Sequence, residues 1–178
     1  MTENLLIALL GFVVSLFTLY IGIKIEKRRQ SLIIRSQMLE PIEEWLKGAE
    51  KMIGIFYDTI VTLIQGLPLP MTYNLEERRK ATQFMIENTN KMLGIIDSKG
   101  LQTKNTKHLA QQLSEIIKNL DNKIKFELLP EDNKLIELAN QKQLNQDFIN
   151  EALKLRNQLD GQVQAAYSII SKIRTKFT

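Results

Sequence analysis

Residues 148–177 read FINEALKLRNQLDGQVQAAYSIISKIRTKF, and their apolar positions are spaced to form one face of a long helix. The spacing alternates between three and four residues, with one irregularity across Gly161, and this is the period of an α-helix that packs through a single stripe. A bundle core and a coiled-coil seam use the same stripe, so both alternatives stay open. The stripe comprises Phe148, Ala152, Leu155, Leu159, Val163, Ala166, Ile170, Ile173 and Phe177.

The same helical period continues toward the N-terminus, without alternating segments long enough for a sheet. Pro41 is well placed to begin a helix, and Pro130 is expected to end one, because a proline ring excludes the i−4 hydrogen bond. A polar stretch at residues 140–146 predicts a break before the final stripe. We therefore predict an all-α fold, an antiparallel bundle of about four helices with a long heptad-like helix at its C-terminal end. The predicted helices cover about residues 41–65, 75–99, 103–129 and 131–177.

Residues 52–64 are apolar enough to raise the alternative of a second membrane segment. This run has 13 residues with Asp58 at its centre, which is too short and places a costly charge at mid-bilayer. We expect a core helix, with an interfacial or re-entrant segment as the alternative. Asp58 is then either a satisfied buried carboxylate or a functional one.

Residues 5–23 form a run of 19 residues without a charge. A membrane-spanning helix needs roughly 20 such residues, so this run predicts a retained transmembrane helix. A secretory signal peptide would carry basic residues before its apolar core, and none precede Leu5. A buried helix of a globular domain would show a polar face. Four cations follow the run and are expected at a membrane surface: Lys24, Lys27, Arg28 and Arg29.

Because these cations all follow the run, the positive-inside rule predicts a short N-terminus outside and the remaining chain in the cytoplasm. Three parts result: a transmembrane helix at 1–23, a basic juxtamembrane stalk at 24–40 and a cytoplasmic helical bundle at 41–178. The net charge of +4 agrees with this division, since residues 24–36 carry five bases against one acid. The remaining 142 residues carry 19 bases and 18 acids, which argues against nucleic-acid binding.

Small residues within the run are spaced 3, 4, 3 and 4, which places them on one face of a helix. In lipid, close backbone approach over small residues drives helix association. We therefore predict a packing face that meets a second copy of the chain or another membrane protein. It consists of Ala8, Gly11, Ser15, Thr18 and Gly22.

The sequence contains no motif that indicates catalysis. It has no cysteine, and its single histidine, His108, has Lys104 and Gln112 at its i−4 and i+4 positions. No glycine-rich phosphate loop or nucleophile elbow is present. We expect no enzyme activity, no cofactor, no metal and no small-molecule substrate.

The function expected from these features is that of a non-enzymatic, single-pass membrane protein that self-associates or binds a partner. The lipid bilayer and a homo-oligomer or membrane-protein partner are the expected contacts. The alternative is an oligomerising, membrane-disrupting or channel-forming effector controlled by its bundle. This alternative rests on the hydroxyl groups of Ser15 and Thr18 within the small-residue face.

Overall fold

The computed structural model describes the backbone of residues 2–67, 75–140 and 145–177, and the side chains of 10–67, 80–138 and 145–177. Every regular element in these ranges is helical, and none is a strand. The prediction of an all-α fold is confirmed. The elements are α1 (Thr2–Gln37), α2 (Glu40–Ile64), α3 (Leu75–Ile96), α4 (Lys107–Lys123), the π-helix η1 (Ile124–Leu128), α5 (Leu129–Asn140) and α6 (Gln146–Phe177).

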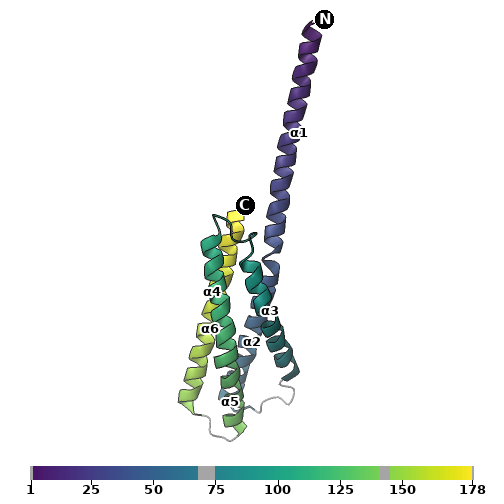
Figure 1. Cartoon of the computed structure of the whole chain (residues 1–178). Helices are drawn as coiled ribbons and strands as arrows, with labels where there is room; N and C mark the ends of the chain where they lie inside the picture. The colour runs from purple at the N-terminus through teal and green to yellow at the C-terminus, as the bar shows by residue number, and fades with distance from the viewer. Residues whose placement is uncertain (1, 68–74, 141–144, 178) are drawn as a thin grey trace.

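Four helical rods form the bundle: α2, α3, the continuous rod α4–η1–α5, and α6. Each rod packs on two neighbours, because α2 and α4 both contact α3 on one side and α6 on the other. Neighbouring rods run in opposite directions (Figure 1). The predicted antiparallel bundle is therefore present, and its core lies where the four apolar stripes meet. Its largest fully buried side chains include Trp45, Phe56 and Ile60 of α2.

The rod through α4, η1 and α5 differs from the prediction that Pro130 ends a helix. The helix continues past Pro130 to Asn140. Its hydrogen bonding changes just before the proline, where the Leu129 N–H donates to the carbonyl of Ile124, five residues earlier. This wider turn accommodates a residue that has no N–H and whose ring would otherwise meet the i−4 carbonyl. A break does occur later, since α5 ends at Asn140 and α6 begins at Gln146.

The end of α2 is defined by a hydrogen-bonded turn around Gly66. Gly66 has a φ of 66°, in the left-handed region that glycine adopts without steric cost. The Gly66 N–H donates to Leu63, and the Leu67 N–H donates to Thr62. This pair of bonds is the Schellman arrangement, which satisfies the last carbonyls of a helix.

Helix α1 projects well beyond the bundle, which it contacts only near its own C-terminal end (Figure 1). It continues through residues 24–37 of the predicted stalk at 24–40 and ends at Gln37. Within the part of the chain that the structure describes, no helix combines the length and the apolar character needed to cross a membrane.

The transmembrane helix predicted for residues 5–23 is therefore not supported by the described residues. The described side chains of the run, at residues 10–23, cover 14 positions, or about 21 Å of helix. A hydrocarbon layer is about 30 Å thick. The side chains of residues 5–9 lie outside the described residues.

Candidate functional site

The described part of α1 is a helix with apolar side chains exposed on all sides. Eleven large hydrophobic residues between Leu10 and Ile25 are exposed, with Phe12 at 64% and Phe17 at 65% of full accessibility. Monomeric proteins rarely leave a continuous apolar surface of this kind uncovered. The surface is thus a candidate contact for lipid or for another apolar surface.

The small residues of the predicted packing face are exposed on this helix. Gly11, Ser15, Thr18 and Gly22 are all exposed, whereas the side chain of Ala8 lies outside the described residues. A Cβ atom added at Gly11 or Gly22 would meet no other described atom within 4 Å. Ser15, Thr18 and Gly22 line a shallow groove together with larger neighbours such as Val14 and Leu19. A groove of this shape permits close approach of a second helix backbone.

Both hydroxyl groups on this face bond within α1 itself. The Ser15 hydroxyl donates to the Gly11 carbonyl and the Thr18 hydroxyl donates to the Val14 carbonyl, each at 2.8 Å. Both hydroxyl protons are therefore bonded within the helix, an arrangement that is common for serine and threonine in helices. The groove consequently presents a largely apolar surface rather than a row of donors.

The predicted membrane-surface cluster follows this apolar surface directly. Its members are exposed: Lys24, Lys27, Arg28 and Arg29. Gln30 donates to the Glu26 carboxylate at 3.1 Å within the same segment. The transition from apolar to basic therefore occurs within one turn of a continuous helix.

The apolar stripe of α6 faces the interior of the bundle. All of its members are buried except Leu155, which is partly buried and packs against the core. This stripe is covered by α2 and α4 of the same chain. It is therefore occupied within one molecule and is not exposed for pairing with a second one.

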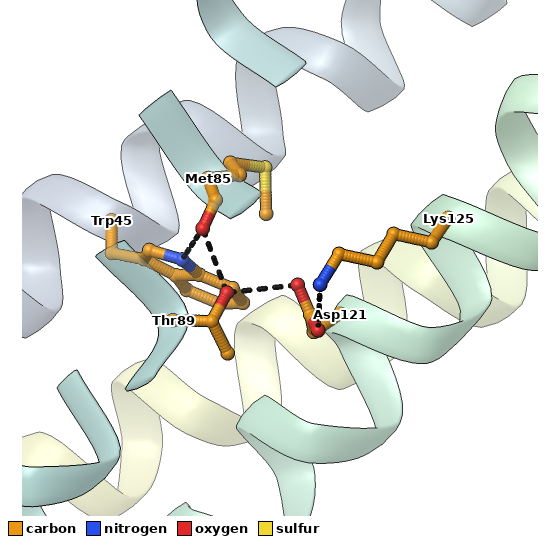
Figure 2. A network of polar contacts seen from close by, with 5 residues as sticks. All are labelled: Trp45, Met85, Thr89, Asp121 and Lys125. Atoms are coloured by element: carbon orange, nitrogen blue, oxygen red, sulfur yellow. Dashed lines mark hydrogen bonds and ion pairs between the residues drawn. The ribbon is translucent and has the colours of Figure 1, made fainter. Parts of the chain in front are cut away.

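A buried polar network connects α2, α3, α4 and η1 near the middle of the bundle (Figure 2). The Trp45 indole N–H donates to the Met85 carbonyl at 3.3 Å. The Thr89 hydroxyl lies 2.7 Å from the same carbonyl and 2.8 Å from Asp121 Oδ1, and its single proton serves one acceptor at a time. Lys125 Nζ lies 2.6 Å from Asp121 Oδ2. The network gives a buried carboxylate two partners, which is the condition for burying one.

Sequence reasoning missed this network because Asp121 lies among charged and amide side chains at helical spacing. Its neighbour Lys125 is at i+4, a pairing typical of exposed helix faces. Only the packing of α4 against α3 buries it. Asp58, which the sequence singled out, is exposed, so the expectation of a buried carboxylate at that position is wrong. It lies on the outer face of α2, opposite the core positions Phe56 and Ile60.

A cavity of about 400 Å³ lies between α2, α3 and the η1–α5 segment. Met52, Ile55 and Ile86 form apolar parts of its lining, and Glu87 and Asp132 supply carboxylates. Carboxylates with aliphatic neighbours do not form an arrangement of nucleophile, base and orienting group. Among the residues that the structure describes, no three His, Cys, Asp or Glu side chains gather to hold a metal ion. His108 is exposed at the start of α4.

Comparisons with known proteins identify no relative of this chain: no protein-family model, no curated protein and no solved structure matches it. The physical properties of the surfaces are therefore the basis for assigning a function.

Proposed function

We propose that the protein is a non-enzymatic, membrane-anchored helical protein that assembles with a second copy or with a membrane-protein partner. The observation that carries this proposal is the exposed apolar surface of α1, which no part of the bundle covers. The bundle core is complete without α1, since α2, α3, α4 and α6 pack on each other. The chain thus has a self-sufficient domain and a separate apolar helix.

The energetic argument favours lipid as the surrounding of α1. Leaving one large apolar side chain in water forgoes about 1.5–3 kcal/mol relative to burial, and eleven such side chains are exposed between Leu10 and Ile25. Their distribution around the whole helix matches a surrounding of hydrocarbon better than a single protein groove. The proposal places the entire uncharged run, residues 5–23, in the bilayer as a single pass.

The basic cluster supports an orientation for this attachment. Lys24, Lys27, Arg28 and Arg29 would lie at the headgroups of the cytoplasmic leaflet, where each cation is worth about 1 kcal/mol. The bundle would then lie in the cytoplasm and the N-terminus outside. Assembly would use the groove lined by Ser15, Thr18 and Gly22, because small residues let two helix backbones approach.

Membrane attachment is tested by expressing the full chain and extracting membranes with alkaline carbonate. The unaltered chain should stay in the membrane pellet. Leu16→Lys combined with Leu19→Lys should move it to the supernatant, because two charges in the bilayer centre cost several kcal/mol. Ile64→Lys combined with Phe126→Lys, at exposed apolar positions of the bundle, adds the same charge and is the matched control, which should remain in the pellet. Recovery of the unaltered chain in the supernatant would contradict the proposal.

Assembly is tested by purifying the chain in mild detergent and measuring the mass of the intact complex. A dimer, a higher oligomer or a complex with a second protein is expected. Gly11→Leu with Gly22→Leu should reduce this complex to the monomer, whereas Val13→Leu, on another face of α1, should leave it intact. A monomeric mass for the unaltered chain, with no second protein present, would refute assembly.

No feature of the described residues favours the channel-forming alternative. It depended on polar groups that face a neighbouring helix, and the Ser15 and Thr18 protons are bonded within α1. The assembly proposal requires only the shape of the groove. We therefore propose no pore.

A further inference from the structure

The two ends of the bundle carry opposite charge. The end next to α1 comprises residues 32–44, 97–108 and 172–177, with seven basic and four acidic residues. The far end includes residues 126–138 and 145–151, which carry six acidic residues and one lysine, beside the end of α2 and the start of α3. These segments are distant in sequence, and the antiparallel packing of the rods gathers them at each end (Figure 1). We refer to the first group as the basic end and to the second as the acidic end.

Contacts between distant segments define the basic end. The last turn of α6 lies against α1, where Phe177 and Arg174 line a small cavity with Leu32, Ile33 and Ser36. The Arg35 guanidinium lies 5.6 Å from the centroid of the Phe177 ring.

The connection between α3 and α4 meets the same end. A Cβ atom at Gly100 would lie 2.6 Å from the Met38 sulfur, at the junction of α1 and α2. The C-terminal end of α6 and the 97–106 connection thus both lie beside the base of α1.

The 97–106 connection has a defined conformation that holds its lysines outward. Leu101 and Thr106 are fully buried. The Thr106 hydroxyl donates to the Leu101 carbonyl and also lies 2.7 Å from the Thr103 hydroxyl. Because these groups bond inward, the lysines of the connection, Lys99 and Lys104, face outward and are exposed.

Five lysines are exposed at this end and form no ion pair with a described residue. Gln112 and Lys172 line one pocket between α4 and α6, so the N-terminal part of α4 lies beside the C-terminal part of α6. The five exposed lysines without an ion pair to a described residue are Lys99, Lys104, Lys107, Lys172 and Lys176.

The acidic residues at the basic end are partly neutralised. Glu43 receives two contacts of 2.8 Å from the Arg174 guanidinium. Asp97 accepts a hydrogen bond from Gln102 at 3.1 Å. Glu40 and Glu44 remain on the first turns of α2 and are exposed. The uncompensated charge at this end is positive and lies mainly on the α4–α6 side.

We propose that the basic end of the bundle docks on an anionic lipid surface and holds the bundle against the membrane. This inference rests on the proposed function, because α1 supplies the geometry. Ile33 lies ten residues after Ile23, or about 15 Å along the helix axis, and the headgroup layer occupies about 5–8 Å of that distance. The level of Ile33 would thus lie about 7–10 Å from the lipid charges. This distance is close to the Debye length of about 8 Å, and the exposed lysine side chains at this end can extend toward the membrane.

The occupant we favour is a lipid surface, because the charge is spread over an end face and the described residues of that end include no exposed Phe, Tyr or Trp on which bases could stack. Nucleic-acid sites for single strands combine basic grooves with stacked aromatics. The acidic end of a second copy is the other candidate of suitable charge, and the experiment below separates it from lipid.

The test uses the full chain reconstituted in vesicles, with one fluorophore on a single introduced cysteine. Because the native chain has no cysteine, each label has one site. Asn105→Cys reports on the basic end, Asn133→Cys on the acidic end and Val13→Cys, outside the small-residue face, on α1. Lipids with a nitroxide on the headgroup quench the first two labels, and lipids with a nitroxide on the acyl chain quench the third.

In vesicles that contain phosphatidylserine, the label at Asn105→Cys should be quenched several-fold more than the label at Asn133→Cys. In pure phosphatidylcholine the quenching at Asn105→Cys should fall severalfold, because only the α1 tether then keeps the basic end near the membrane. Replacing Lys99, Lys104 and Lys107 together by Gln should lower the docked-to-free ratio by roughly fivefold per lysine. The control Lys118→Gln, Lys134→Gln and Lys154→Gln removes the same charge elsewhere and should preserve the quenching.

Equal quenching at Asn105→Cys in neutral and anionic vesicles would overturn docking, and so would indifference to the loss of the three lysines. Quenching that depends on protein density but not on phosphatidylserine would assign the basic end to a second copy, which also overturns it. The label at Val13→Cys reports separately on attachment. If it is quenched while Asn105→Cys is not, docking alone fails, and if neither is quenched, both proposals fail.

Discussion

Thr89 of α3 and Asp121 of α4 meet inside the bundle, with 2.8 Å between the Thr89 hydroxyl and the Asp121 carboxylate (Figure 2). Both side chains are buried, with 5% and 8% of their surface accessible. This contact fixes how α3 and α4 are aligned along their length, because a shift of either helix would separate a buried carboxylate from a donor. A polar pair of this kind favours one alignment of the helices in a way that interchangeable aliphatic contacts do not.

Thr89→Val should lower the free energy of unfolding by about 1–3 kcal/mol, because it leaves a buried acceptor without its donor at nearly constant volume. Chemical denaturation followed by circular dichroism measures this change. Ser168→Ala, which removes an exposed hydroxyl from α6, should alter stability by less than about 0.5 kcal/mol. Equal stability of Thr89→Val and the unaltered chain would show that the contact carries no stabilising energy.

Trp45→Ala should destabilise the bundle by about 3–5 kcal/mol, because it opens a cavity at a fully buried position. The substitution also removes the N–H that bonds to the Met85 carbonyl. Far-UV circular dichroism during thermal unfolding would record the loss as a lower Tm. Trp45 is the only tryptophan, so the unaltered chain offers a fluorescence signal that should shift to longer wavelength when the bundle unfolds. An unshifted Tm in the variant would argue against a core position.

Pro130→Ala distinguishes a continuous rod from a helix that ends at residue 129. In the continuous rod, helix content should stay unchanged, and stability should rise by about 1–3 kcal/mol because alanine restores an N–H and removes a ring from a helix interior. Circular dichroism at 222 nm with denaturant titration measures both quantities. A marked gain in helix content would indicate instead that the proline interrupts the rod.

Tyr167 should titrate later than an ordinary tyrosine. Burial, together with the nearby Glu50 carboxylate that accepts its hydrogen bond at 3.2 Å, raises the pKa of Tyr167 to about 12 from 10.0. Because the folded-state pKa lies above the unfolded value, this group's contribution to stability is complete below pH 10 and is lost as the pH rises toward 12.

Absorbance at 295 nm during alkaline titration detects this phenol. Tyr167→Phe should remove a step near pH 12 and should reduce the loss of stability between pH 10 and 12. Glu50→Gln should move the step to lower pH, since it removes the negative charge while keeping an acceptor. A titration with identical late steps in the unaltered chain and in Tyr167→Phe would contradict the assignment.

The sequence alone determined the helical character of the chain and the number of rods in the bundle. The reason is local: apolar residues at steps of three and four define a helix face wherever they occur. The stripe from Phe148 to Phe177 illustrates this, because nearly all of its residues lie in the core. The exposed, uniformly apolar character of the described part of α1 likewise follows from composition alone.

Only the tertiary structure decided which charged groups are buried, paired or gathered. Asp58 and Asp121 both occur on helices with strong apolar faces, yet one is exposed and the other is buried. Their difference depends on the rotation of each helix against its neighbours, which no single helix encodes. The charge separation between the two ends also requires the folded chain, since α6 must return to the base of α1 before Lys172 and Lys176 lie beside the 97–106 connection. At Pro130, a local rule predicted the end of a helix. The helix instead continues to Asn140, because packing on both sides of the π-helix η1 stabilises it.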